Sequence, residues 1–325
     1  MQRTTDRNVA RGFAAPAPAA PGPIMLAADG SPASAAAFAV VRRLAERDGA
    51  RVEVVSVLEP MNVVVPPIDP PRPVTHHGVS RLTERHELIQ ELMRRTLGSA
   101  RPWPTEIVFG ERVPSLARVA TERGARLVVT GHVHHGAMER IMRGETPLGV
   151  ARAARVPVLA VPATLDRLPR CVVVGVGLGD AGTRVGEISD ALFGDAVAIH
   201  LVHVRTPALP RHDREVREED HVEEAKGEHA FARVLASWRL PPDVPVTTHE
   251  RIGRPEEELL AIARTLEADL LVVGLSPRPD APHLPHRSLA PRLYREWPHA
   301  ILIAPVDDVL ARRAPDGRQP AITHA

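Results

Sequence analysis

The sequence predicts an α/β protein made of two tandem domains, each with a five-stranded parallel sheet that helices cover on both faces. Three observations lead to this prediction. The chain of 325 residues suits two domains of about 150 residues each. Short apolar runs alternate with helical patterns, which is typical of strand–helix–strand crossovers. The second half then repeats the order and spacing of the first.

Composition narrows the fold and the partners further. Hydrophobic residues make up 44% of the chain but aromatic residues only 3%, so Val, Leu, Ile and Ala must fill the core. Buried parallel strands between Ala-rich helices meet this need better than a sandwich with aromatic layers. The 41 basic and 40 acidic side chains leave a formal net charge of +1. Such a balance attracts no polyanion, so we expect neither nucleic acid nor a membrane as a partner.

Ten apolar runs are the expected strands. The first half contains Ile24–Ala28, Val52–Leu58, Ile107–Phe109, Leu127–Val129 and Val158–Val161. The second half contains Val172–Val174, Ala198–Val204, Val246–Thr248, Leu270–Val273 and Ile301–Ile303.

One offset relates the two halves. A shift of 143 residues carries the first member of each of these pairs onto the second: Gly110 and Gly253, Leu127 and Leu270, Gly131 and Gly274, Leu159 and Leu302. Chance composition does not keep one offset across two helices and two strands, so the repeat indicates a duplication. Its seam falls between Leu165 and Arg170.

These observations set the expected boundaries and location. We expect a disordered arm over 1–22, domains over 23–165 and 169–308, and a flexible tail over 312–325. The arm lacks the continuous apolar region of a signal peptide, and no run approaches the roughly 20 apolar residues that cross a bilayer. The single cysteine, Cys171, cannot form an internal disulfide and suits a reducing compartment. We therefore expect a cytoplasmic protein.

Three motifs, present in the same order in both halves, carry a family resemblance. They are the strand end Ala28–Ser31, the block that ends with Leu127–Gly131, and the closing strand Val156–Pro162. With them the chain resembles the universal stress protein family from Ile24 to Pro305. The resemblance implies tandem Rossmann-like domains of the adenine nucleotide α-hydrolase type, and ATP or another adenine nucleotide as the ligand.

The resemblance points to a phosphate loop in the first domain. In a parallel sheet the strand ends and the helix N-termini meet at one edge, where free N–H groups attract phosphate. The family loop reads glycine, two residues, glycine, nine residues, glycine, then Ser or Thr. Gly131 and Gly144 keep the outer spacing, while His134 replaces the middle glycine. Glu145 takes the Ser/Thr position, and Thr146 follows one place later. The carboxylate of Glu145 would repel a triphosphate.

Three further residues join this candidate site. The resemblance places Asp29 at the adenine and ribose end of the nucleotide and Val57 beside the base, and His132 follows the first loop glycine. An alternative stays open for Asp29, because an acid just before Ser31 and Pro32 is also typical of a turn or cap at a helix start.

In the second domain the resemblance points to five positions: Gly177, Val204, Gly274, Arg287 and Ser288. Prolines in the loop after Gly274 remove backbone donors that a phosphate needs. A rival interpretation starts from the G-x-G-x-x-G pattern over 177–182, which favours an NADP-type dinucleotide. The acid that usually follows the next strand is absent, since Arg205 stands there.

Other chemistry has little support in the sequence. Histidines cluster at His132, His134 and His135, but without the regular spacing of a zinc site, so no metal is expected. The usual hydrolase and P-loop signatures are absent. We therefore expect no enzyme, or at most slow incidental ATP hydrolysis.

The resulting hypothesis is a nucleotide-binding, or formerly nucleotide-binding, stress-response module. The alternative is a degenerate scaffold that binds a protein partner. Family members commonly pair through their fifth strands, so we expect Val156–Pro162 to meet Ala300–Pro305 within one chain, as an intramolecular pseudo-dimer. Pairing would also cover two aggregation-prone edges. Whether two chains form a homodimer stays open.

Overall fold

The computed structural model describes residues 22–60, 75–98, 102–132, 145–177, 185, 192–205, 231–232, 235–236, 243–275 and 289–305. The expected tail over 312–325 lies outside these ranges, as does the expected arm apart from Gly22. None of the described helices is both long and apolar enough to span a bilayer.

The structure confirms all ten expected strands and lengthens most of them. The first half contains β1 (Ile24–Ala27), β2 (Val52–Leu58), β3 (Thr105–Phe109), β4 (Leu127–His132) and β5 (Val158–Pro162). The second half contains β6 (Cys171–Gly175), β7 (Ala198–Arg205), β8 (Val246–Ile252), β9 (Leu270–Leu275) and β10 (Ala300–Pro305). The described helices are α1 (Pro32–Asp48), α2 (Thr75–Leu97), α3 (Arg112–Glu122), α5 (Thr146–Ala154), α8 (Pro255–Thr265) and α9 (Ala290–Glu296).

The strands form one sheet in the order β3-β2-β1-β4-β5-β10-β9-β6-β7-β8. Each half keeps the predicted five parallel strands, and the two sheets join where β5 and β10 pair antiparallel, with Leu159 opposite Leu302. These are the two strands that the sequence analysis expected to meet. Both are apolar and fully buried, so neither presents an unpaired edge to solvent.

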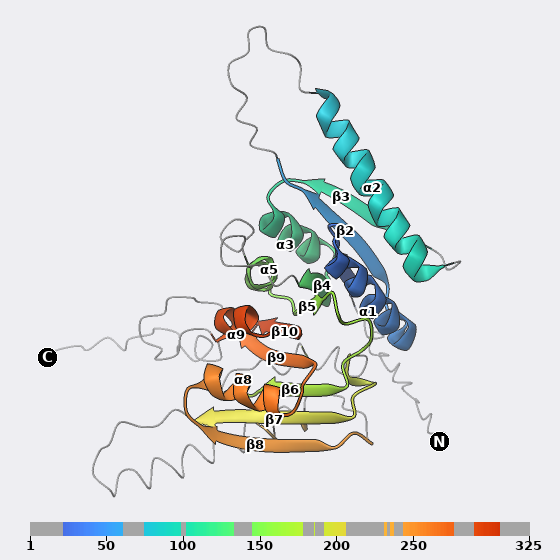
Figure 1. The fold of residues 1–325 in the computed structure, drawn as a ribbon. Coiled ribbons are helices and arrows are strands. Elements are labelled where there is room, and N and C mark those ends of the chain that lie inside the picture. The colour runs from blue at the N-terminus through green and yellow to red at the C-terminus, as the bar shows by residue number, and fades with distance from the viewer. Residues whose placement is uncertain are drawn as a thin grey trace, which may run out of the picture.

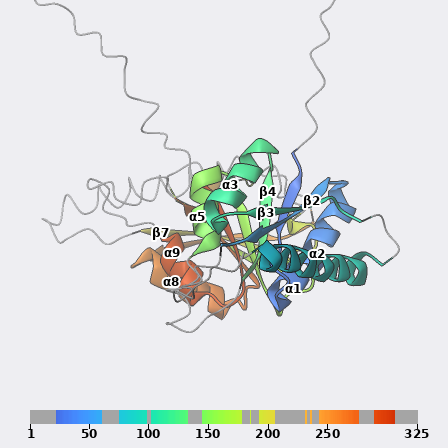
Figure 2. The ribbon, with the colours of Figure 1, turned by 90° about the horizontal axis from the view of Figure 1, so that it is seen from above.

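Described helices cover both faces of the first half of this sheet, as expected for parallel strands, and α8 and α9 pack on one face of the second half (Figure 1). Viewed from above, α1 and α2 lie on one side of the first half, and α3 and α5 on the other (Figure 2). Two apolar layers result, and each runs through both halves. At the seam, Leu159 and Leu302 belong to one layer, and Ala160 and Ile301 to the other. The tandem halves therefore share a continuous core.

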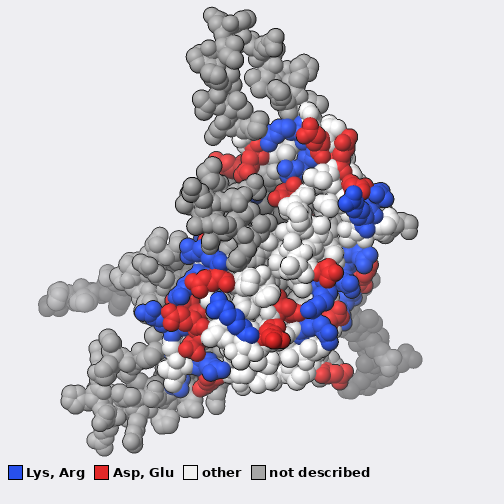
Figure 3. All heavy atoms as spheres, in the orientation of Figure 1, with Lys and Arg blue, Asp and Glu red and all other residues white. Residues whose placement is uncertain are grey.

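The surface carries both signs of charge. Figure 3 shows basic and acidic side chains intermingled over the described part of one face, without a broad field of one sign. This distribution matches the balanced composition, because a field that attracts a polyanion needs charge of one sign to gather.

Gly131, near the end of β4, lies directly against the first turn of α1. A Cβ atom at Gly131 would come within 2.8 Å of the Cβ atom of Ala33 and 2.9 Å of its carbonyl carbon. That turn is fixed by Ser31, whose Oγ accepts a hydrogen bond of 3.2 Å from the backbone N–H of Ser34. Close packing of α1 on β4 is therefore sufficient reason for a glycine here.

We expect Gly131→Ala to lower the free energy of unfolding by about 1–3 kcal/mol, because the added methyl group must displace the helix backbone. Urea unfolding of the full chain measures this. Gly177→Ala is the matched control, because a Cβ atom at Gly177 meets nothing within 4 Å, and its effect should stay within about 0.5 kcal/mol. Equal stability of the two variants would contradict the packing argument.

Candidate functional site

A cavity of about 240 Å³ lies at the carboxyl edge of the first half. The ends of β1, β2 and β4 and the starts of α1 and α5 form it, as expected for an open parallel sheet. Four of the predicted site residues line it: Asp29, Val57, Gly131 and Thr146. Its volume exceeds the roughly 150 Å³ of an engineered cavity that holds benzene, so a group the size of a heteroaromatic ring has room.

Asp29 is held in one orientation by its own turn. Its Oδ1 accepts hydrogen bonds from the Ser34 hydroxyl at 2.7 Å and from the Ser31 backbone N–H at 3.0 Å. Its backbone N–H donates in turn to Ser34 Oγ at 3.1 Å. The geometry therefore bears out the turn-acid interpretation of Asp29. The same carboxylate also lines the cavity, so the two interpretations are compatible.

The pKa of Asp29, an exposed residue, is lowered. Partial loss of contact with water at its turn raises this pKa, but the hydrogen bonds from Ser34 and Ser31 outweigh it, and the positive charge of Arg85 adds to the lowering. Asp29 is therefore a fixed anion at neutral pH, positioned to accept a hydrogen bond from a ligand hydroxyl.

Two guanidinium groups, one from each face of the sheet, lie near Asp29 at the carboxyl edge of the first half. Arg85 donates a hydrogen bond of 3.2 Å to Ser56 Oγ, and Arg112 lines the cavity and pairs with Glu59 at 2.6 Å. The pKa of Arg85 is lowered, first by burial and further by the charges of Arg112 and Arg81, while Asp29 opposes the change. The cavity thus has both an anion and cations beside it.

Thr130 is a polar residue that the sequence analysis did not select. It lines the cavity and is only 6% exposed. Its Oγ1 has no hydrogen-bond partner among the described residues. A buried hydroxyl without a partner is costly and calls for an explanation. The only sequence signal was its position, since a polar residue interrupts the apolar run of β4 just before Gly131.

Tyr294 also lines this cavity, although it belongs to α9 of the second half. Its ring stacks on that of His132, with centroids 4.6 Å apart and planes inclined by 22°. His132 is only 4% exposed. This residue, which was predicted to bind the nucleotide, is therefore packed against the tyrosine and does not face the open cavity. Burial, and then the charge of Glu145, raise the pKa of Tyr294. Sequence could not find this contact, because it forms only across the seam.

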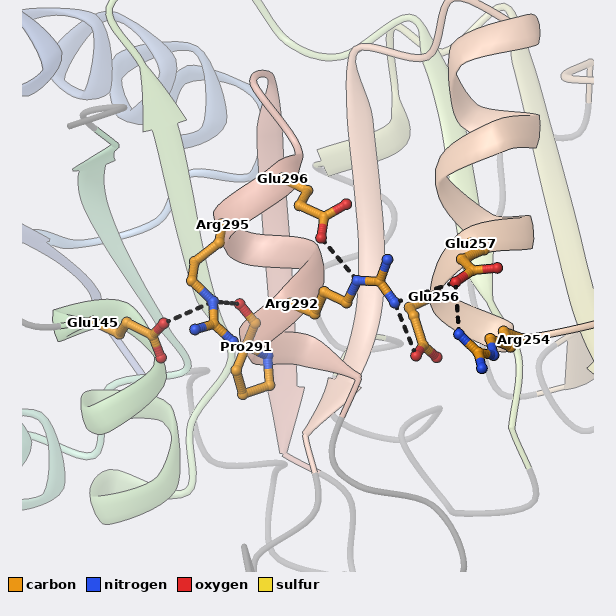
Figure 4. A network of polar contacts seen from close by, with 8 residues as sticks. All are labelled: Glu145, Arg254, Glu256, Glu257, Pro291, Arg292, Arg295 and Glu296. Carbon is orange, nitrogen blue, oxygen red and sulfur yellow. Dashed lines mark hydrogen bonds and ion pairs between the residues drawn. The ribbon is translucent and has the colours of Figure 1, made fainter. Parts of the chain in front are cut away.

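Glu145 is turned toward the second half. It precedes α5, and its carboxylate lies 3.4 Å from Nε of Arg295 on α9. Figure 4 shows this pair beside a second group of ion pairs, in which Arg292 contacts Glu256 and Glu296. Glu145 does not appear among the residues that line the cavity. The repulsion expected between this carboxylate and a bound phosphate is therefore partly offset by Arg295.

Two predicted loop residues of the first half, His134 and Gly144, lie outside the described residues, as do Arg287 and Ser288 of the second half.

Strand register identifies the equivalent positions in the second half. The backbone N–H of Ala28 donates to Val55, and that of Val176 donates to Val202. Gly177 therefore takes the place of Asp29, so the second half has no carboxylate at this position. By the same register Val204 matches Val57, and it is partly buried against the core.

Comparison with known proteins agrees with this architecture. The model of the Universal stress protein family matches residues 22–162 and again 171–305. Universal stress proteins of Mycobacterium tuberculosis and Mycobacterium bovis are 28% identical to the chain over 180 residues. These alignments cover 52% of this chain and 58% of each relative, so they span less than two thirds of the relatives' own length.

A solved structure supports the fold independently. A universal stress protein from Archaeoglobus fulgidus superposes with a TM-score of 0.62, covering 88% of this chain and 97% of that chain at 15% sequence identity. At this identity the likeness shows the fold alone. The family model, by contrast, matches most of the sequence, once in each half. The chain therefore belongs to the universal stress protein family, as a tandem of two family domains.

Proposed function

We propose that the protein is a cytoplasmic binding module that responds to an adenine nucleotide, such as ATP, held in the cavity of its first half. One observation carries this proposal: Thr130, whose Oγ1 has no hydrogen-bond partner among the described residues, lines the same cavity as the oriented carboxylate of Asp29. A bound ligand with several polar groups would supply the missing partner. The proposed role is binding rather than catalysis.

The shape and charge of the cavity suit the parts of a nucleotide. Val57 and Tyr294 offer apolar and aromatic surface for a base. Asp29 offers an acceptor for a ribose hydroxyl. Two helix N-termini, at Pro32 and Thr146, line the cavity, and Arg112 lines it as well. Helix N-termini and guanidinium groups both favour phosphate oxygens.

The alternative is a scaffold that no longer binds nucleotide, and one observation favours it. The packing of α1 on β4 explains Gly131 whether or not a phosphate lies nearby. A retained glycine is therefore no argument for a retained ligand. Titration of the full chain with ATP and AMP by calorimetry separates the two proposals, since the scaffold predicts no saturable binding below millimolar concentration.

Thr130→Val should act in opposite directions on stability and on binding. It removes a buried hydroxyl without a partner, so the free protein should gain about 1 kcal/mol of unfolding free energy. Adenine nucleotide binding should weaken on the order of tenfold, the value of about one hydrogen bond. Urea unfolding and calorimetry measure the two effects.

The matched control for this test is Thr121→Val. Thr121 lies on α3, where its Oγ1 donates to the carbonyl of Ala117 at 2.9 Å, away from the cavity residues. Its variant should keep the wild-type affinity. Unchanged affinity in Thr130→Val as well would remove the main support for the proposed site.

Asp29 should make the stability depend on pH. Its folded-state pKa lies below the ordinary value of 3.8, so its contribution is present above that value and is lost as the pH falls through the folded-state pKa. Asp29→Asn should lack this part of the acid dependence, and it should also weaken nucleotide binding. Unfolding free energies of both proteins between about pH 7 and pH 3 test this; parallel curves would argue against an ionised, hydrogen-bonded Asp29.

Tyr294 provides a direct probe, because it is the only tyrosine in the chain. Burial and Glu145 raise its pKa, so tyrosinate absorbance near 295 nm should appear only above the ordinary tyrosine pKa of about 10. Circular dichroism at each pH identifies any unfolding. A midpoint near the ordinary value in the folded protein would mean that Tyr294 does not close the cavity.

A further inference from the structure

Two histidines face each other across the outer strands of the second half. His200 lies on β7 and His249 on β8, the edge strand that Figure 1 shows at the far end of the sheet. His200 Nδ1 and His249 Nε2 are 3.1 Å apart. The ring centroids are 5.2 Å apart, with planes inclined by 49°. Both side chains are partly exposed, so a solute can reach them.

The first half holds a different group at the equivalent place. Strand pairing sets Glu53 opposite Met25 and His200 opposite Val173, so these two positions match. Glu106 matches His249 in the same way, because they lie opposite Val55 and Val202. The two glutamates are bridged there by Arg123.

That bridge ties β2 to β3. Arg123 Nη1 lies 3.4 Å from Glu53, and Nη2 lies 2.9 Å from Glu106. Arg123 is the C-cap residue that follows α3, and Leu266 is the C-cap residue that follows α8. The second half therefore has an imidazole in place of each carboxylate and a leucine in place of the bridging cation.

The two imidazoles are suited to binding a metal ion in place of an arginine. Burial lowers the pKa of both rings, with His249 adding to the effect on His200 and Arg251 to that on His249. Neutral imidazole is the form that ligates metal. The ring that donates the present hydrogen bond needs only to move its proton to its other nitrogen, so both facing nitrogens can offer lone pairs without a change in net charge.

We propose that His200 and His249 chelate one divalent transition-metal ion, of the Cu²⁺ and Ni²⁺ class, which ties β8 to β7. Nitrogens 3.1 Å apart, each about 2.0–2.1 Å from an ion, subtend about 95–102° at that ion. The lower end of this range is near the right angle of the tetragonal sites that Cu²⁺ and Ni²⁺ prefer. Each ring must turn from its present hydrogen-bonded orientation to aim its lone pair at the ion. The ion takes the place that Arg123 has in the first half.

The site is a bidentate one. Among the described residues no third His, Cys, Asp or Glu side chain joins a group that could hold a metal, so water fills the remaining positions. Such a site exchanges its ion readily. Nothing in the sequence indicated it, because the two histidines are 49 residues apart, and the sequence analysis expected no metal.

Cu²⁺ titration of the full chain, with glycine present to strip ions from single histidines, tests the proposal. Electron paramagnetic resonance should show one Cu²⁺ with two imidazole nitrogens, and the ion should raise the melting temperature. His200→Asn and His249→Asn should each weaken binding by about tenfold or more. His86→Asn, an exposed histidine on α2, is the matched control and should bind as the wild type does.

A different kind of variant, Leu266→Arg, keeps both imidazoles. It places a cation where the first half has Arg123, so Cu²⁺ binding should be lost through repulsion while circular dichroism stays native. Binding by His200→Asn or His249→Asn as tight as in the wild type would overturn the proposal. A wild-type spectrum with a single nitrogen ligand would overturn it as well.

Discussion

The antiparallel pairing of β5 with β10 is the contact on which the rest of the structure depends. It joins two five-stranded sheets into one and runs both apolar layers across the seam. It also sets α9 beside α5. Tyr294 can therefore stack on His132, and Arg295 can approach Glu145. Tyr294, one of the residues that line the cavity of the first half, comes from the second half, so the tandem arrangement is part of the site.

Duplication has left two similar backbones with different chemistry. At the carboxyl edge of the sheet the first half has Asp29, and the second has Gly177 at the equivalent position. Beneath α3 the first half has Glu53 and Glu106 bridged by an arginine, and the second half has two imidazoles. Strand pairing is set by backbone hydrogen bonds and apolar packing, so these side chains can change without altering the fold.

Glycine spacing and ligand binding are separate matters in this protein. The loop pattern of the family directed attention to Gly131 as a phosphate residue. Its closest constraint is the first turn of α1, which leaves no room for a Cβ atom. The stronger sign of a ligand is Thr130, whose buried hydroxyl has no partner among the described residues. A glycine in a motif can serve packing or ligand binding, and only the contacts in the folded structure distinguish the two.

The sequence by itself determined the strands, their succession along the chain and the duplication, because apolar runs and their spacing are local properties of a linear chain. The family resemblance also directed attention to Asp29, Val57 and Thr146, which line the cavity. Only the tertiary structure revealed the contribution of Tyr294 and the pairing of His200 with His249. These contacts join residues far apart in the chain, and their distances depend on strand register and on the seam, which no local pattern specifies.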